Sequence, residues 1–298
     1  MLSTNQKNVL KKNGYLIIPN KIDDTLISNA QISFNAIKKK AKQGLYPFIR
    51  VYDDYCLSNN LAGIEMTFHK DILDQHMINF IQNAKILDYA KSVLGDNIEL
   101  DLSRYHLTEN FSHVGIWHRD AKINHDNLSI QINVFLFDET GLQVIDNSHT
   151  QLINEENEIK KKPHTTLSSS KWISTKAGEV LIFDPAVLHR AISEKPRANI
   201  HFRFKKILNT NIKKKIFDCQ NLVVSDQWIE VLNNSPNAID ETILKKYTKN
   251  RGLKSIFLIF CRRIIYNLIF FLPLKSRLYR FFEVRPNLFL RRIFKIIS

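Results

Sequence analysis

The chain has 298 residues, 44% of them hydrophobic, so it can bury a sizeable core and global disorder is excluded. Its three cysteines lie far apart with no CxxC spacing, which argues against a disulfide framework or a cysteine-built metal site and fits a reducing compartment. The formal net charge is +14, but residues 205–298 hold 19 Lys and Arg against 6 Asp and Glu, leaving 24 and 23 for the first 204. We therefore expect two differently composed regions and, because no signal-peptide-like stretch opens the chain, a cytoplasmic protein.

The first hundred residues favour helices around one short strand. A polar opening segment can be helical, and the apolar run at residues 15–18 lies between Gly14 and Pro19, as a buried strand would. Residues 23–42 carry apolar positions at helical spacing, and residues 71–95 suit a pair of helices that ends at Gly95.

From residue 98 the pattern changes to short apolar and alternating runs separated by turn residues, among them a turn expected at 138–141. The predicted strands are residues 98–106, 128–137, 142–145, 180–183 and 200–204. Helices followed by many short strands indicate an α+β protein with a mainly β core, a sandwich or barrel that carries its helices on the outside.

The segment Trp117-His118-Arg119-Asp120 places an imidazole and a carboxylate two residues apart. On an extended segment, residues i and i+2 point to the same side, so both can reach one ion. His189, which follows a glycine, an apolar strand and a turn, is the candidate third ligand. Two histidines and one carboxylate form the facial set that leaves open positions on a non-haem Fe(II).

A second His-x-Asp occurs at His69-Lys70-Asp71, so the spacing by itself does not identify the site. That pair begins a helical segment and has no strand-rich pattern around it. We therefore interpret it as a chance match, and the sequence around His118 has to decide between the two.

The surrounding sequence resembles the phytanoyl-CoA dioxygenase family of double-stranded β-helix oxygenases. The resemblance extends over about residues 9–206 and rests on four blocks in the right order: residues 13–19, 117–120, 141–149 and 177–204. Asp146 and Asn147 replace the family's usual Pro-Gly before Ser-His; both are good turn formers, and Asn tolerates the left-handed conformation that Gly would supply.

The resemblance implies a double-stranded β-helix, of jelly-roll or cupin-like type, that uses Fe(II), 2-oxoglutarate and O2. It makes His118, Asp120 and His189 the metal ligands and catalytic centre. Arg197, which begins the strand after His189, is expected to hold the distal carboxylate of 2-oxoglutarate with its planar fork.

Three further residues are expected beside the co-substrate. Arg203 competes with Arg197, because it lies on the same strand and by parity faces the same side. Arg104, on the strand before the metal motif, can face the same cavity, although a structural salt bridge is an equal alternative. Asn133 stands where family members often have a bulky aromatic residue, so it should enlarge or polarise the pocket and leaves the substrate open.

The expected reaction is hydroxylation of an unactivated C–H bond in a lipid, a glycan or a small metabolite. Asp120 favours hydroxylation over halogenation, because halogenating relatives replace this carboxylate with a small residue. The alternative is a non-catalytic β-helix protein that binds a ligand or a membrane. Trp117 and His149 are interpreted as structural. The remaining nearby histidines receive no role beyond lining the pocket: His106, His113, His125 and His201.

The sequence divides into an oxygenase domain at 1–206, a linker or helical region at 207–250 and basic amphipathic helices at 251–298. The last region is very apolar but has Arg262 and Arg263 at its middle, so no uncharged run is long enough to span a bilayer. We expect it to lie on an anionic membrane surface, which would make the protein peripheral on the inner face. Packing of these helices on the core is the competing interpretation, and nucleic-acid binding is a less favoured one.

Overall fold

The computed structural model describes residues 1–19, 22–42, 63–65, 73–108, 113–114, 116–123, 128–161, 165–193, 197–208 and 226–233. The predicted basic helices at 251–298, most of the region at 207–250 and the second His-x-Asp at 69–71 lie outside these residues. Among the helices described, none is both long and apolar enough to cross a membrane.

The first two helices and the first strand lie where the sequence predicts them. Helix α1 (Thr4–Asn13) begins with a capping box between Ser3 and Gln6 and ends at Gly14 in the left-handed conformation. Strand β1 (Tyr15–Ile18) follows at once, and helix α2 (Asp24–Lys42) comes next.

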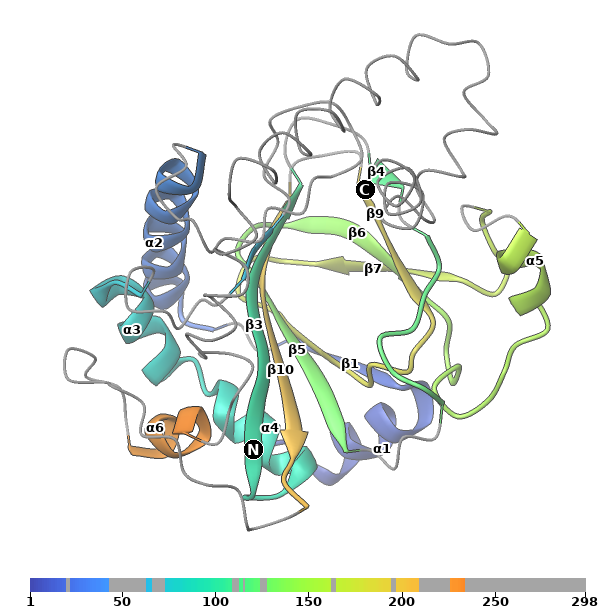
Figure 1. Ribbon diagram of the computed structural model, residues 1–298, viewed down its shortest axis with the longest axis horizontal. Coiled ribbons are helices and arrows are strands. Elements are labelled where there is room, and N and C mark those ends of the chain that lie inside the picture. The colour runs from blue at the N-terminus through green and yellow to red at the C-terminus, as the bar shows by residue number, and fades with distance from the viewer. Residues whose placement is uncertain are drawn as a thin grey trace, which may run out of the picture.

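A layer of helices covers the outer face of the larger sheet. Helices α3 (Gln75–Asn83) and α4 (Ile86–Leu94) confirm the predicted pair, and α2, α3, α4 and the short α6 (Asp226–Asn233) lie on the side of β3 and β10 (Figure 1). Their apolar faces and the outward side chains of that sheet form one buried cluster. From α6, Trp228 joins this cluster and donates its indole N–H to the carbonyl of Ile81, 3.1 Å away.

Two antiparallel sheets form the core. The larger has the order β1-β8-β5-β10-β3-β2, and the smaller β4-β9-β6-β7. The larger sheet contains β2 (Gly63–Glu65), β3 (Ile98–Thr108), β5 (Ser129–Phe135), β8 (Val180–Phe183) and β10 (Arg197–Lys206). The smaller contains β4 (His113–Val114), β6 (Glu139–Val144), β7 (Lys171–Thr175) and β9 (His189–Ser193), and a helical turn α5 (Glu156–Lys161) lies between β6 and β7. The two sheets enclose an interior between them (Figure 1), which is the expected double-stranded β-helix.

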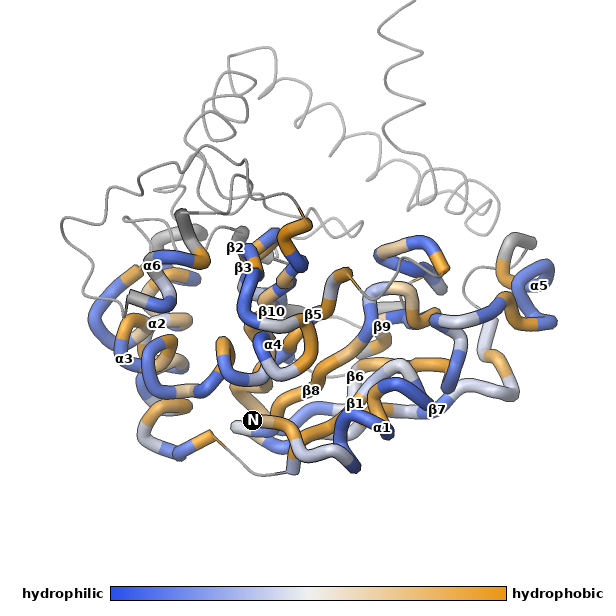
Figure 2. The backbone as a smooth tube through the Cα atoms, turned by 90° about the horizontal axis from the view of Figure 1, so that it is seen from below, coloured by the Kyte–Doolittle hydropathy of each residue, from blue (hydrophilic) through white to orange (hydrophobic). Residues whose placement is uncertain are grey.

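Strand β8 is apolar on both faces, but its neighbour β10 alternates. Figure 2 shows β8 in the hydrophobic colour, and all four of its side chains are buried. On β10 the even-numbered side chains from Ala198 to Phe204 enter the cluster under the helices. The odd-numbered ones therefore face the interior: Arg197, Asn199, His201 and Arg203. The interior of the β-helix is consequently polar along this strand.

The structure corrects the prediction at several strands, and strands β2, β4 and β9 were not predicted. The predicted turn at residues 138–141 is wrong, because Glu139 and Thr140 already pair within β6 and a bulge accommodates Gly141. Strand β7 was not predicted. It is an edge strand on which only Ile173 and Thr175 are buried, so it lacks the apolar alternation that identifies a strand.

The turn after β6 ties the smaller sheet to the N-terminus. Asn147 adopts φ 59°, the left-handed conformation expected from the sequence, and its N–H donates to the carbonyl of Asn13 at 2.9 Å. His149 has the structural role predicted for it, with Nε2 3.1 Å from the carbonyl of Lys11. A Cβ on Gly14 would lie 2.4 Å from Nδ1 of His149, so only glycine allows this close approach.

Substitutions at Asn147 should separate backbone strain from side-chain bonding. We expect Asn147→Ala to lower the free energy of unfolding by about 1–2 kcal/mol and Asn147→Gly to change it by less than about 0.5 kcal/mol, because glycine tolerates positive φ. Urea denaturation measures both. Thr150→Val is the control, since the Thr150 hydroxyl donates to the Asn147 side chain. Equal losses in the alanine and glycine variants would mean that the side-chain bond, and not the backbone, matters here.

Candidate metal centre and its polar surroundings

His118, Asp120 and His189 come together as the sequence predicts. Each offers one ligand atom, and these atoms lie within 4.8 Å of one another. His118 and His189, the first residue of β9, form an isolated antiparallel bridge with N···O distances of 2.9 and 3.0 Å in the two directions. The N–H of Asp120 donates to the carbonyl of Pro185 at 2.8 Å. The backbone therefore fixes the His-x-Asp segment directly against the turn that presents the third ligand.

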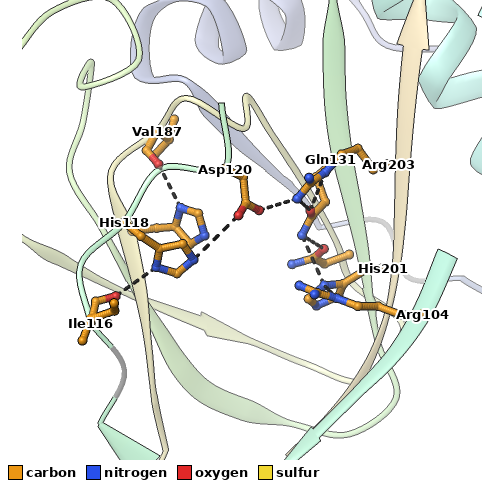
Figure 3. Close-up of polar contacts among 10 residues, drawn as sticks. Arg104, Ile116, His118, Asp120, Gln131, Val187, His201 and Arg203 are labelled. Carbon is orange, nitrogen blue, oxygen red and sulfur yellow. Dashed lines mark hydrogen bonds and ion pairs between the residues drawn. The ribbon is translucent and has the colours of Figure 1, made fainter. Parts of the chain in front are cut away.

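Both imidazoles are oriented by a backbone carbonyl two residues earlier. Nδ1 of His118 lies 2.9 Å from the oxygen of Ile116, and Nδ1 of His189 lies 2.8 Å from the oxygen of Val187 (Figure 3). Because a carbonyl can only accept, Nδ1 carries the proton in both rings and Nε2 keeps its lone pair. Nε2 of His118 lies 3.8 Å from Oδ1 of Asp120, and the two ring centroids are 4.3 Å apart. Two nitrogen lone pairs and a carboxylate thus converge.

The protonation states also suit a metal site. Burial, together with the neighbouring His118, lowers the pKa of His189 to about 4, although Asp120 opposes the shift. Burial raises the pKa of Asp120, but His189, Arg203 and His118 outweigh it, so that the pKa is lowered overall. At neutral pH the site therefore offers a neutral His189 and an ionised Asp120, the forms in which these residues bind metals.

The residues beside the candidate ligands point away from the metal position, and their hydrogen bonds hold the His-x-Asp segment and the turn before His189 in place. Arg119 donates to the carbonyl of Ala186 at 2.5 Å and also contacts the Ser148 carbonyl and the Glu156 carboxylate. The Ser148 hydroxyl accepts from the N–H of Leu188 at 2.8 Å, directly before His189. Trp117 is buried and donates to the carbonyl of Thr165, which confirms its predicted packing role.

The two carboxylate oxygens of Asp120 have different neighbours. Oδ1 faces His118, whereas Oδ2 contacts an Nη of Arg203. The same guanidinium donates to Oε1 of Gln131 at 2.8 Å. Arg203 therefore holds the carboxylate through the oxygen that does not face the histidines, and it lies on the inner side of β10, as parity predicts.

A row of polar side chains continues from Gln131 along the inner wall (Figure 3). Nε2 of Gln131 donates to Oδ1 of Asn133 at 3.0 Å and lies 3.2 Å from Nδ1 of His201. Nε of Arg104 donates to the same Nδ1 at 3.1 Å. The predicted residues Arg104 and Asn133 thus line one interior, joined through Gln131 and His201. The sequence predicts only a lining role for His201 and no role for Gln131, although the strand parity that selects Arg203 also selects His201.

Arg197 faces the interior at the other end of β10. One Nη donates to the carbonyl of Gly141 at 2.6 Å, and the other lies 3.3 Å from Oε1 of Glu139. Asn199 donates to both oxygens of that carboxylate. Burial raises the pKa of Glu139, although Arg197 opposes the shift. This buried ion pair was not foreseen from the sequence, because Glu139 lies in the segment predicted as a turn.

On the inner face of β10, two buried N–H groups have no hydrogen-bond partner within the described part of the chain: Nε of Arg197 and Nε2 of His201. Buried donors in folded proteins are nearly always paired, with protein or with a ligand. The interior therefore has the means to bind an oxygen-rich anion beside a site that can hold a divalent metal.

Comparison with known proteins agrees with this fold. No family model matches the chain, and no curated protein matches it by sequence. Several solved structures are similar to the chain in fold. EctD from S. alaskensis, crystallised with 2-oxoglutarate and 5-hydroxyectoine, is 19% identical with a TM-score of 0.52, and the match covers 69% of this chain and 77% of EctD. AviO1 from Streptomyces viridochromogenes is 14% identical with a TM-score of 0.55, over 68% of this chain and 95% of its own.

A third similar structure is HygX from Streptomyces hygroscopicus with nickel and 2-oxoglutarate bound. It is 12% identical with a TM-score of 0.52, and the match covers 75% of this chain and 94% of HygX. At these identities the likeness establishes the fold.

The buried His201 should make stability depend on pH. Burial and the neighbouring cations lower its pKa well below the ordinary 6.5 in the folded state, so the unfolded chain takes up a proton first as the pH falls. We expect wild type to lose about 2 kcal/mol of unfolding free energy between pH 7 and pH 5 that His201→Asn does not lose. Urea denaturation across this range measures the difference.

The control for this experiment is His76→Gln, which removes an exposed histidine and should retain the full pH-dependent loss of wild type. Parallel pH profiles for wild type and His201→Asn would contradict a neutral, buried His201.

Proposed function

We propose that the protein is an Fe(II)- and 2-oxoglutarate-dependent oxygenase that hydroxylates an unactivated C–H bond of a lipid, glycan or small-metabolite substrate. One observation carries the proposal: Nε2 of His118, Nε2 of His189 and a carboxylate oxygen of Asp120 converge, with both Nδ1 atoms bonded to backbone carbonyls. When bound, iron, 2-oxoglutarate and O2 supply the oxidising chemistry. The three side chains would hold the metal on one face and leave the opposite face open.

The ligands bound in similar structures support this choice of cofactors. EctD was crystallised with Fe and with 2-oxoglutarate, and HygX with nickel and 2-oxoglutarate. The donor set of this chain suits the same groups, because imidazole and carboxylate bind ferrous iron and related divalent ions. The presence of Asp120 supports hydroxylation, since the carboxylate fills the position that halogenating relatives leave for halide.

Arg197 is the better candidate for the distal carboxylate of 2-oxoglutarate. Arg203 contacts Asp120 itself, so its guanidinium lies at the metal and not one five-carbon chain away from it. Arg197 reaches Gly141, which lies three residues along β6 from the partner of His189, Val144. Three strand residues span about 10 Å. That separation, and the buried Nε with no protein acceptor, suit the far end of a short diacid.

Arg203, Asn133 and Arg104 would hold the residues that bind the metal and 2-oxoglutarate in position. Arg203 holds Oδ2 of Asp120 and so directs Oδ1 towards the metal position. Asn133 and Arg104 act through Gln131 and His201, to which they are hydrogen-bonded. We assign them positioning roles in cofactor binding, because Asn133 bonds to Gln131 and Arg104 bonds to His201.

Anaerobic titration of the protein with Fe(II) and 2-oxoglutarate tests the proposal. We expect a weak metal-to-ligand charge-transfer band in wild type, which His118→Ala abolishes because one of three metal ligands is lost. His76→Ala, at an exposed histidine outside the site, should retain the band. A wild-type protein that binds neither iron nor 2-oxoglutarate would defeat the proposal and favour the non-catalytic alternative.

The role of Arg197 can be tested without leaving a buried charge unpaired. The double variant Arg197→Gln with Glu139→Gln removes both members of the ion pair. We expect it to bind Fe(II) as wild type does but to raise the Kd for 2-oxoglutarate by about ten-fold or more, the effect of losing a charge-assisted hydrogen bond. Arg203→Gln, in contrast, should weaken Fe(II) binding, because Arg203 holds Asp120. If the double variant kept the 2-oxoglutarate affinity of wild type, Arg203 and not Arg197 would be the residue that binds the distal carboxylate of 2-oxoglutarate.

A further inference from the structure

His201 occupies the centre of the inner wall, between the two arginines of β10. It is 5% exposed, two residues from Arg203 and four from Arg197, on the same face of the strand. Its Cα pairs with Arg104 on β3 and with Asn133 on β5, so a strand flanks it on each side. The imidazole therefore projects from the middle of the sheet into the polar interior, one step along the strand from the residue that holds Asp120.

The hydrogen bonds around His201 determine which nitrogen carries the proton. Arginine can only donate, so the contact of Arg203 with Gln131 orients the amide with Oε1 towards Arg203 and Nε2 towards His201. Nε of Arg104 donates to Nδ1 of His201 as well. Two donors therefore converge on Nδ1, which must be the acceptor nitrogen.

The imidazole is neutral, which leaves it with a single N–H at Nε2. Burial lowers the pKa of His201 first, and the neighbouring Arg104, His106, Arg197 and Arg203 lower it further. His106 also stacks on the ring, with centroids 5.1 Å apart and planes 19° from parallel. A ring flip would place Cδ2–H, which cannot accept a hydrogen bond, against the two donors, so the stacked ring has one orientation.

The resulting Nε2–H is a buried donor without an acceptor among the described residues. Nε of Arg197 is a second one on the same face of β10. Two such donors on one inner wall fit a ligand that presents oxygen acceptors, because a buried N–H otherwise loses the hydrogen bond it makes with water in the unfolded chain.

We propose that His201 donates its Nε2–H to the distal carboxylate of 2-oxoglutarate, next to Arg197. The inference rests on the proposed function and deepens it, since it adds a neutral donor to the charged one. Arg104 and Gln131 become positioning residues: by donating to Nδ1 they direct the only N–H of the ring towards the ligand. A carboxylate can accept from both donors at once, because its two oxygens offer about four lone pairs.

Two substitutions separate the donor from the rest of the ring. In His201→Asn the side-chain oxygen can replace Nδ1 as acceptor for Arg104 and Gln131, but nothing reaches the position of Nε2. In His201→Gln the amide nitrogen can replace the Nε2 donor. Each variant is titrated anaerobically, as the Fe(II) protein, with 2-oxoglutarate and with 2-oxovalerate, which carries a methyl group in place of the distal carboxylate. The charge-transfer band reports binding of either keto acid.

We expect His201→Asn to raise the Kd for 2-oxoglutarate by about ten-fold, to leave the Kd for 2-oxovalerate within about two-fold, and His201→Gln to restore most of the loss. Equal weakening of both keto acids in His201→Asn, or no weakening of either, would overturn the inference. Binding of 2-oxovalerate shows that each variant is folded around its metal. If wild type gave no band with either acid, the proposed function itself would be overturned. If wild type gave the band with 2-oxoglutarate and His201→Asn left its Kd unchanged, only the role of His201 would be overturned.

Discussion

The reciprocal backbone hydrogen bonds between His118 and His189 are the constraint on which the candidate site depends. They join the segment after β4 to the first residue of β9, so two ligands that lie 71 residues apart share one short stretch of backbone pairing. Each imidazole is then oriented by the carbonyl two residues before it. Because these contacts are made by backbone atoms, the orientation of the metal-facing nitrogens depends on the path of the chain more than on any neighbouring side chain.

The second organising feature is the alternation of β10. Its even-numbered side chains complete the apolar core under the helices, whereas its odd-numbered ones line the interior with cations and amides. One strand therefore contributes both to the stability of the larger sheet and to the chemistry of the site. A shift of one residue in its register would exchange these two sets, so the apolar core also fixes the position of Arg197, His201 and Arg203 relative to the candidate metal ligands.

Charge in this interior is arranged so that histidines stay neutral and carboxylates stay paired. Glu139 is held by Arg197 and Asn199, and Asp120 by Arg203. His189 and His201 are buried and lie beside cationic side chains, and both the burial and these neighbours lower their pKa values. Neutral imidazoles can bind a metal or donate one directed hydrogen bond, and the arginines add charged donors along the same wall.

Local sequence patterns determined much of this protein: the helices at 24–42 and 75–94, most strands of the larger sheet, the left-handed turn at Asn147 and the three candidate ligands. The helices, the strands and the turn follow from periodicity and turn chemistry, which act over a few residues, whereas the choice of ligands needed the resemblance of the surrounding sequence to a known family as well as their spacing. Only the tertiary structure decided the pairing of Arg197 with Glu139 and the donors that converge on His201. Those contacts join residues 58 to 97 positions apart, between the two sheets at Arg197 and between neighbouring strands of the larger sheet at His201. Their geometry depends on strand register, bulges and packing that no short stretch of sequence specifies.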